Sequence, residues 1–185
     1  YKRKTGPAGT ANYWLFIPTV FCENRNLDVI REALHNELGY SVTNKYRNYT
    51  KLLIEAYKEG KEPASFGSLT PSPKGKDGMG LLFKNVDGIK FLNHQGGCGG
   101  TRQDAATLSK LLAAYANHPN AGGITLLSLG CQHLQVPDFL NDLKKINPSF
   151  DKPLFIFQQQ ESASEEQLIS DAIKKTFEGL IEINK

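Results

Sequence analysis

Short apolar segments alternate with segments of helical periodicity along this chain, and this alternation limits its fold more than any other feature. The apolar segments lie at residues 12–20, 89–94, 122–130 and 153–160. Between and after them, apolar residues recur at every third or fourth position, as on one face of an amphipathic helix. These helical segments lie at residues 27–38, 49–60, 102–117, 136–147 and 164–180. Strands that are apolar throughout are typical of parallel sheets covered on both faces. We therefore predict a three-layer, Rossmann-like α/β fold, with a mainly parallel sheet and helices on both faces.

The domain organisation follows from the length and from local composition. A chain of 185 residues suits one α/β domain, which we place at residues 11–185 after a linker at 1–10. Residues 60–79 are rich in glycine, proline, serine and lysine, and we expect a flexible insertion there, acting as a lid, binding a partner or simply mobile. The chain opens on Tyr1 without a methionine, which we interpret as a fragment or a processed chain.

Charge and cysteine content exclude several classes of protein. The net charge is +3, and the basic residues are scattered, so we expect no nucleic-acid partner. No apolar run approaches the ~18 residues of a membrane span, and no signal peptide opens the chain. Three cysteines without close pairs argue against a disulfide scaffold and for a reducing compartment. We predict a cytoplasmic protein with no membrane association.

Chemically active side chains follow the predicted strands. In open parallel sheets, ligands bind beyond the carboxyl ends of the strands. Every cysteine comes just after a strand, and a histidine lies close to two of them. We expect these side chains to face one edge of the sheet and to line a functional pocket. They are Cys22, His94, Cys98, Cys131 and His133.

A glycine-rich turn, Gly96–Gly100, precedes the helix that we predict from residue 102. Glycines permit a tight turn and a close approach of backbone to a ligand. The N-terminus of the helix suits a carboxylate or a phosphate, and Arg102 could add a bidentate contact to a carboxylate. Our candidates for substrate binding are Gly97, Gly99, Arg102, Gln103 and Asn24.

Alternative chemistries remain open at this turn. Neither a dinucleotide fingerprint nor a P-loop is present. The sequence around Cys98 reads G-x-C-x-G, the cysteine version of a nucleophile elbow, which with His133 as base would indicate a hydrolase or an amidotransferase-like enzyme. Alternatively, His94 and Cys98, with Cys131 and His133, could ligate iron or zinc. A non-enzymatic binding module is the third interpretation.

Ordered blocks of sequence carry a family resemblance. The blocks are residues 9–26, 93–104, 115–135 and 157–161. Together they resemble the altronate dehydratase and galactarate dehydratase family of sugar-acid hydro-lyases, in the middle segment of the enzyme. The chain departs from the family at Ala11, where arginine is common, and at Gln132, where glutamate is common.

The resemblance implies a reaction and a cofactor. Altronate would lose water to give 2-keto-3-deoxygluconate, a step of hexuronate catabolism. The divalent metal would be Fe²⁺, with Mn²⁺ as the alternative. His94 and Cys98 would take catalytic or metal-binding roles, with Cys131 and His133 as further ligands. The partners would be the N- and C-terminal domains of the same enzyme, and a homo-oligomer is left open. The fragment alone would be inactive.

Overall fold

The chain contains a four-stranded, fully parallel sheet. A computed structural model describes residues 1–40, 45–62, 67 and 81–185, so most of the insertion expected at 60–79 lies outside the described residues. The strands are β1 (Tyr13–Pro18), β2 (Gly88–Phe91), β3 (Ala121–Ser128) and β4 (Leu154–Gln158). Their spatial order is β2-β1-β3-β4. The predicted parallel α/β sheet is confirmed.

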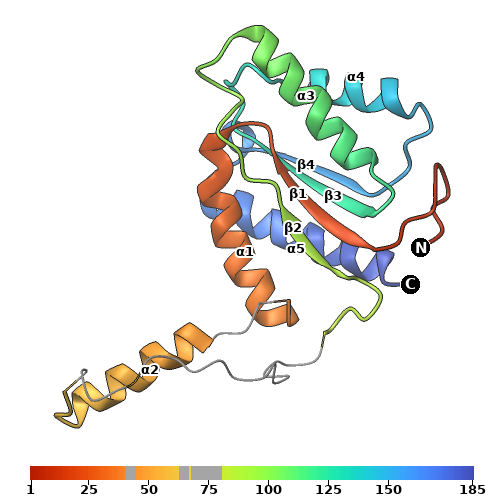
Figure 1. Cartoon of the computed structure of the whole chain (residues 1–185). Helices are drawn as coiled ribbons and strands as arrows, with labels where there is room; N and C mark the ends of the chain where they lie inside the picture. The colour runs from red at the N-terminus through yellow and green to blue at the C-terminus, as the bar shows by residue number, and fades with distance from the viewer. Residues whose placement is uncertain (41–44, 63–66, 68–80) are drawn as a thin grey trace.

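Helices cover both faces of this sheet (Figure 1). One face is covered by α1 (Asn24–Leu38) and α5 (Glu165–Ile183), and the other by α3 (Arg102–Asn117) and α4 (Val136–Ile146). The helix α2 (Lys45–Lys58) stands apart from these layers in Figure 1. Short 3-10 turns follow β1 and β4, at Phe21–Glu23 and Gln159–Glu161. The architecture is therefore the predicted three-layer one.

The side chains of β1 divide between two hydrophobic cores. Trp14 and Phe16 pack with α1 and α5, whereas Leu15 and Ile17 pack with α3 and α4. Successive residues of a strand point to opposite faces of the sheet, so a strand buried on both faces must be apolar at every position. This is the physical reason for the uninterrupted apolar segments in the sequence.

Trp14 is closely packed in the core. A Cβ atom at Gly123 or Gly179 would lie 2.2 Å or 2.1 Å from atoms of its ring. The indole Nε1–H donates to Thr125 Oγ1 at 2.9 Å, and the ring stacks on Phe155 with centroids 5.7 Å apart. The two glycines thus let β3 and α5 approach the indole closely from either side.

The first residues of the chain are tied to the amino edge of the sheet. The Arg3 guanidinium donates to the carbonyls of Pro119 and Ala11 at 2.8 Å and 3.2 Å. The Asn120 side-chain oxygen accepts the backbone N–H of Thr10 at 2.8 Å. Ala11 precedes β1 and therefore lies at the edge opposite to the carboxyl ends of the strands.

The strand order creates a topological switch point between β1 and β3. The chain passes from β1 outward to β2, and then returns across β1 to form β3. In doubly wound sheets, the crevice outside the carboxyl ends of two such strands is the usual ligand site. In Figure 1 the strands end on the left, where α1, α3 and α5 begin.

The helices in the described part of the chain include none with the length and apolar character that a membrane span requires.

Candidate functional site

Loops that follow β1, β2 and β3 meet at the switch point. The Phe21 N–H donates to the Gly96 carbonyl at 3.0 Å, and the His133 N–H donates to the Gly97 carbonyl at 2.9 Å. These bonds join the loop after β2 to the loops on either side. Because the strands are parallel, the loops that carry all three cysteines, His94 and His133 lie at one edge of the sheet.

At Gly97 the glycine turn closely approaches the loop after β1. Its φ is +96°, and a Cβ atom there would lie 2.2 Å from the Thr19 carbonyl oxygen and 2.6 Å from Val20 Cα. Gly99 shares the left-handed conformation at φ +78° but has no atom within 4 Å of its Cβ position. Gly97 is therefore required by packing as well as by backbone conformation, whereas Gly99 is required by backbone conformation alone.

The His94 ring braces the glycine turn. Its Nε2 lies 2.8 Å from the Pro18 carbonyl oxygen, and its Nδ1 accepts the Gly96 N–H at 3.1 Å. This pairing assigns the proton to Nε2 and uses the lone pair on Nδ1. A metal ligand must offer a ring-nitrogen lone pair, so His94 in this arrangement is not free to bind a metal.

The described residues do not form a metal centre on their own. No group of three or more His, Cys, Asp or Glu side chains among them could hold a metal ion. The candidates Cys98, Cys131 and His133 are exposed on their loops. The donor set present here therefore does not fit a complete iron site, and metal ligation by these residues stays a prediction.

Cys98 lies in a long loop and not at a sharp elbow. β2 ends at Phe91 and α3 begins at Arg102, whereas a nucleophile elbow joins its strand directly to its helix in a strained turn. No described residue other than glycine has a positive φ, so Cys98 lacks the backbone strain of an elbow. The geometry gives no support to the nucleophile interpretation.

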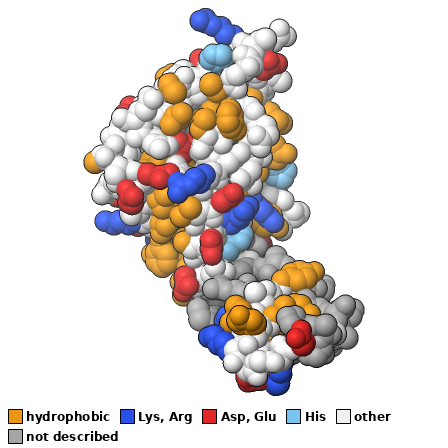
Figure 2. All heavy atoms as spheres, turned by 90° about the vertical axis from the view of Figure 1, so that its left-hand side faces the viewer, with side chains coloured by type: hydrophobic (Ala, Val, Ile, Leu, Met, Phe, Trp, Pro, Cys, Tyr) orange, Lys and Arg blue, Asp and Glu red, His pale blue; other side chains and the backbone are white. Residues whose placement is uncertain are grey.

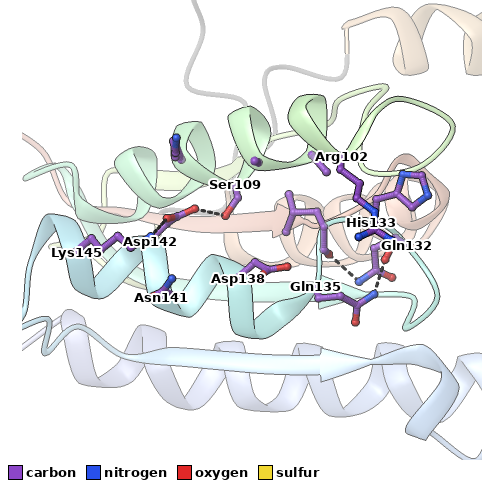
Figure 3. A pocket seen from close by; sticks show the side chains of 13 residues that line it. Arg102, Ser109, Gln132, His133, Gln135, Asp138, Asn141, Asp142 and Lys145 are labelled. Atoms are coloured by element: carbon purple, nitrogen blue, oxygen red, sulfur yellow. Dashed lines mark hydrogen bonds and ion pairs between the residues drawn. The ribbon is translucent and has the colours of Figure 1, made fainter.

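Two cavities adjoin the first turn of α3. The smaller one, of about 420 Å³, is lined by the glycine turn, Thr101, Asp104 and His133. The larger one, of about 570 Å³, is a groove between α3 and α4. In Figure 3, Arg102 and His133 lie at one end of this groove, and Asp142 and Lys145 lie toward the other. His133 lines both cavities, so they are neighbours.

Arg102 is available to bind a ligand. It is exposed and lines the groove, and within the described part of the chain no hydrogen bond or ion pair engages its guanidinium. Its neighbours at the helix start are already paired: the Asp104 carboxylate accepts the Thr101 N–H at 2.8 Å, and this bond holds the pKa of Asp104 below its ordinary value. Arg102 is thus the free positive charge at this helix N-terminus.

The other candidates for substrate binding differ in their placement. Gly97 and Gly99 line the smaller cavity. Gln103 is exposed on the first turn of α3 but lines neither cavity. Asn24 donates through Nδ2 to the His94 carbonyl at 2.8 Å, and its side-chain oxygen is buried. Asn24 therefore holds the loop after β2 and does not face either cavity.

Gln132 closes the loop after β3. It is buried, its Oε1 accepts the Gly130 N–H at 2.7 Å, and its Nε2 donates to Ser128 Oγ at 2.7 Å and to the Leu134 carbonyl at 3.0 Å. A carboxylate at this position could accept the first bond but could not donate the other two. The amide is matched to this loop, which explains the departure from glutamate.

Sequence reasoning missed Glu23. Its side chain is 0% exposed although it directly follows β1 at the switch point, and burial raises the pKa of its carboxyl. The only sequence signal was an acidic residue placed between a buried strand and a helix start. That pattern is common on protein surfaces, so burial of the carboxyl could not be inferred.

The charge on this edge is mixed. Figure 2 looks onto the side of the molecule that is on the left of Figure 1, where the strands end. Lys and Arg side chains lie there among Asp and Glu side chains. Charge of a single sign therefore does not dominate the side seen in Figure 2.

Comparisons with known proteins agree on one family. The chain matches, over residues 1–184, the family described as D-galactarate dehydratase/Altronate hydrolase, second domain. It is 32% identical over 65 residues to the altronate dehydratase of Escherichia coli (strain K12), a match that covers 35% of this chain and 13% of that protein. It is 24% identical over 147 residues to the altronate dehydratase of Bacillus subtilis (strain 168), covering 80% of this chain and 21% of that protein. No solved structure matches the chain.

Proposed function

The chain belongs to the D-galactarate dehydratase/altronate hydrolase family, and on that premise we propose that it contributes the carboxylate-binding part of an enzyme that dehydrates altronate to 2-keto-3-deoxygluconate. The free Arg102 guanidinium, which lines the groove between α3 and α4 at the N-terminus of α3, carries this proposal. An unpaired cation and a helix N-terminus both favour a bound carboxylate.

The chemistry requires that negative charge be stabilised next to a carboxylate. Removal of the proton at C2 of a sugar acid places charge on that carboxylate, and loss of the 3-hydroxyl then needs an acid. Arg102 would bind the carboxylate, and the polar groove between α3 and α4 would accept the hydroxyl groups, with His133 at the junction of the two cavities. The divalent metal, Fe²⁺ or Mn²⁺, stays a prediction.

Replacing Arg102 tests the carboxylate site. We expect the Arg102→Gln variant to bind altronate roughly tenfold to a hundredfold more weakly, because a hydrogen bond to a charged group contributes about 1.5–3 kcal/mol. The dissociation constant would be measured by calorimetry. The matched control is Arg31→Gln, an exposed arginine of α1 that pairs with Asp28 at 2.7 Å. Equal affinities for the two variants would contradict the proposal.

We further expect the chain alone to show little or no turnover of altronate. Elimination needs a base, an acid and a carboxylate-binding group held together, and a displacement of about 1 Å can cost on the order of 100-fold. The curated relatives are several times longer than the matched segments, so the remaining groups would come from other domains. The assay is turnover with iron(II), alone and after the remaining domains of a full-length relative are added. Robust turnover by the chain alone would refute this expectation.

The setting of the reaction is also a proposal. Hexuronate catabolism in the cytoplasm accords with the family and with three cysteines that form no disulfide. A homo-oligomer is compatible with this function.

A further inference from the structure

Buried oxygens without a donor gather where α1 begins. Among the described residues, four buried side-chain atoms lack a hydrogen-bond partner, and three of them are Glu23 Oε1, Asn24 Oδ1 and Asn26 Oδ1. Leaving a buried polar atom unpaired is costly, about 1–3 kcal/mol each. All three atoms are acceptors, so this position lacks hydrogen-bond donors.

Two of these oxygens belong to groups that already share a bond. Asn26 Nδ2 donates to Glu23 Oε2 at 3.0 Å, which leaves the second oxygen of each group without a donor. One proton on Glu23 Oε1 would supply a donor for Asn26 Oδ1 and would satisfy both oxygens at once. The two groups would then form a cyclic acid–amide pair, each donating once and accepting once.

We propose that Glu23 and Asn26 form a buried proton site, in which Glu23 is a neutral carboxylic acid at neutral pH. The proton comes from a hydronium ion of the solvent, which becomes water, and binds Glu23 Oε1; no other covalent bond is made or broken. This inference goes beyond the proposed function and does not depend on which reaction the enzyme catalyses.

The surroundings of Glu23 favour the neutral form. Its side chain is 0% exposed, and burial, which is the largest effect, raises the pKa of its carboxyl. The Glu165 carboxylate of α5 raises that pKa further, whereas the Asn26 bond lowers it. Arg25, the cation two residues further along the chain in α1, is paired with Glu165 at 2.5 Å. From the end of β4, Gln159 Oε1 accepts a long bond of 3.4 Å from Asn26.

A second influence, besides the Asn26 bond, opposes protonation. Glu23 stands at the N-cap of α1, and its side chain makes no capping bond. The positive end of a helix dipole favours the ionised carboxyl, but this effect is modest compared with full burial. The unpaired acceptors and the burial therefore decide the protonation state.

The proposal predicts how stability depends on pH. The pKa of Glu23 in the folded state is raised above its value in the unfolded state. The stabilisation that this carboxyl gives to the folded state is therefore complete below the unfolded pKa, and it is lost as pH rises through the folded pKa. In Glu23→Gln, the new amide donates and accepts like the acid but does not titrate. The unfolding equilibrium constant of the original chain, divided by that of this variant, should increase with pH. Between the unfolded and the folded pKa of Glu23, the increase should reach up to about tenfold for each pH unit.

The protonation state can be read without any variant. In the original chain with ¹³C-labelled glutamate carboxyls, one carboxyl carbon should keep the chemical shift of an acid at pH 7 while the others titrate at lower pH. Infrared spectroscopy should show a protonated-carboxyl band that is absent from Glu23→Gln and present in the control Glu182→Gln, which changes an exposed glutamate of α5. If every glutamate carboxyl is ionised at pH 7, or if Glu23→Gln leaves the pH dependence of unfolding unchanged, the proposal is wrong.

Discussion

Replacing Gly97 with alanine is expected to lower the free energy of unfolding by about 2–5 kcal/mol and to weaken sugar-acid binding. A left-handed conformation costs a non-glycine residue roughly 1–2 kcal/mol. The added methyl group would also lie 2.2 Å from the Thr19 carbonyl oxygen, and relief of such overpacking costs about 1–3 kcal/mol. Since the contact is with backbone, the glycine turn has to move away from the loop after β1.

Gly99→Ala is the matched control for this prediction. Gly99 has a similar positive φ, but no atom lies within 4 Å of its Cβ position, so only the conformational cost of roughly 1–2 kcal/mol is expected. Both variants would be compared by urea denaturation and by the dissociation constant for altronate. Equal losses in the two variants would show that the close approach of Gly97 to Thr19 does not hold the loops together.

Replacing Trp14 with alanine is expected to destabilise the chain by about 3–5 kcal/mol, the range for truncating a large buried aromatic side chain. The indole fills the space between Gly123 and Gly179. Neither glycine has a side chain that could move into the cavity, so collapse of the site would be limited. The measurement is the denaturant midpoint, with an unchanged slope as the sign that cooperative unfolding is preserved.

Trp14→Phe separates packing from hydrogen bonding. Phenylalanine keeps most of the ring volume but removes the Nε1–H that donates to Thr125 Oγ1. Thr125 Oγ1 would keep its 2.6 Å contact with Thr176 Oγ1, so the loss should be far smaller than for alanine. A phenylalanine variant as unstable as the alanine variant would mean that the hydrogen bond, and not the filled volume, is the dominant contribution of Trp14.

The site residues show where inference from sequence succeeds and where it fails. The sequence was enough to place the cysteines and histidines after strands and at one edge of the sheet, because parallel strands all end at the same edge whatever their order. The role of His94 could not be inferred from the sequence. Its ring nitrogens are used by Pro18 and Gly96, and only the fold brings the end of β1 to this ring. The same holds for Asn24, whose side chain turns inward to the loop after β2.

The sequence by itself determined the elements and the class of fold. Apolar periodicity and end signals act over a few residues, so they can be read locally. Gly39 ends α1 in the left-handed conformation, and Ser164 caps α5 by accepting the Gln167 N–H, so both of these ends are set by local residues. The continuous apolar strands likewise required a sheet covered on both faces.

Only the tertiary structure decided which residues of the carboxyl edge are free to act. The order β2-β1-β3-β4 places the switch point between β1 and β3, and no local pattern specifies that order. Burial of Glu23, the close contact at Gly97 and the freedom of Arg102 all depend on which loops meet there. These properties arise from contacts between residues far apart in the chain, whereas periodicity reports only on neighbours.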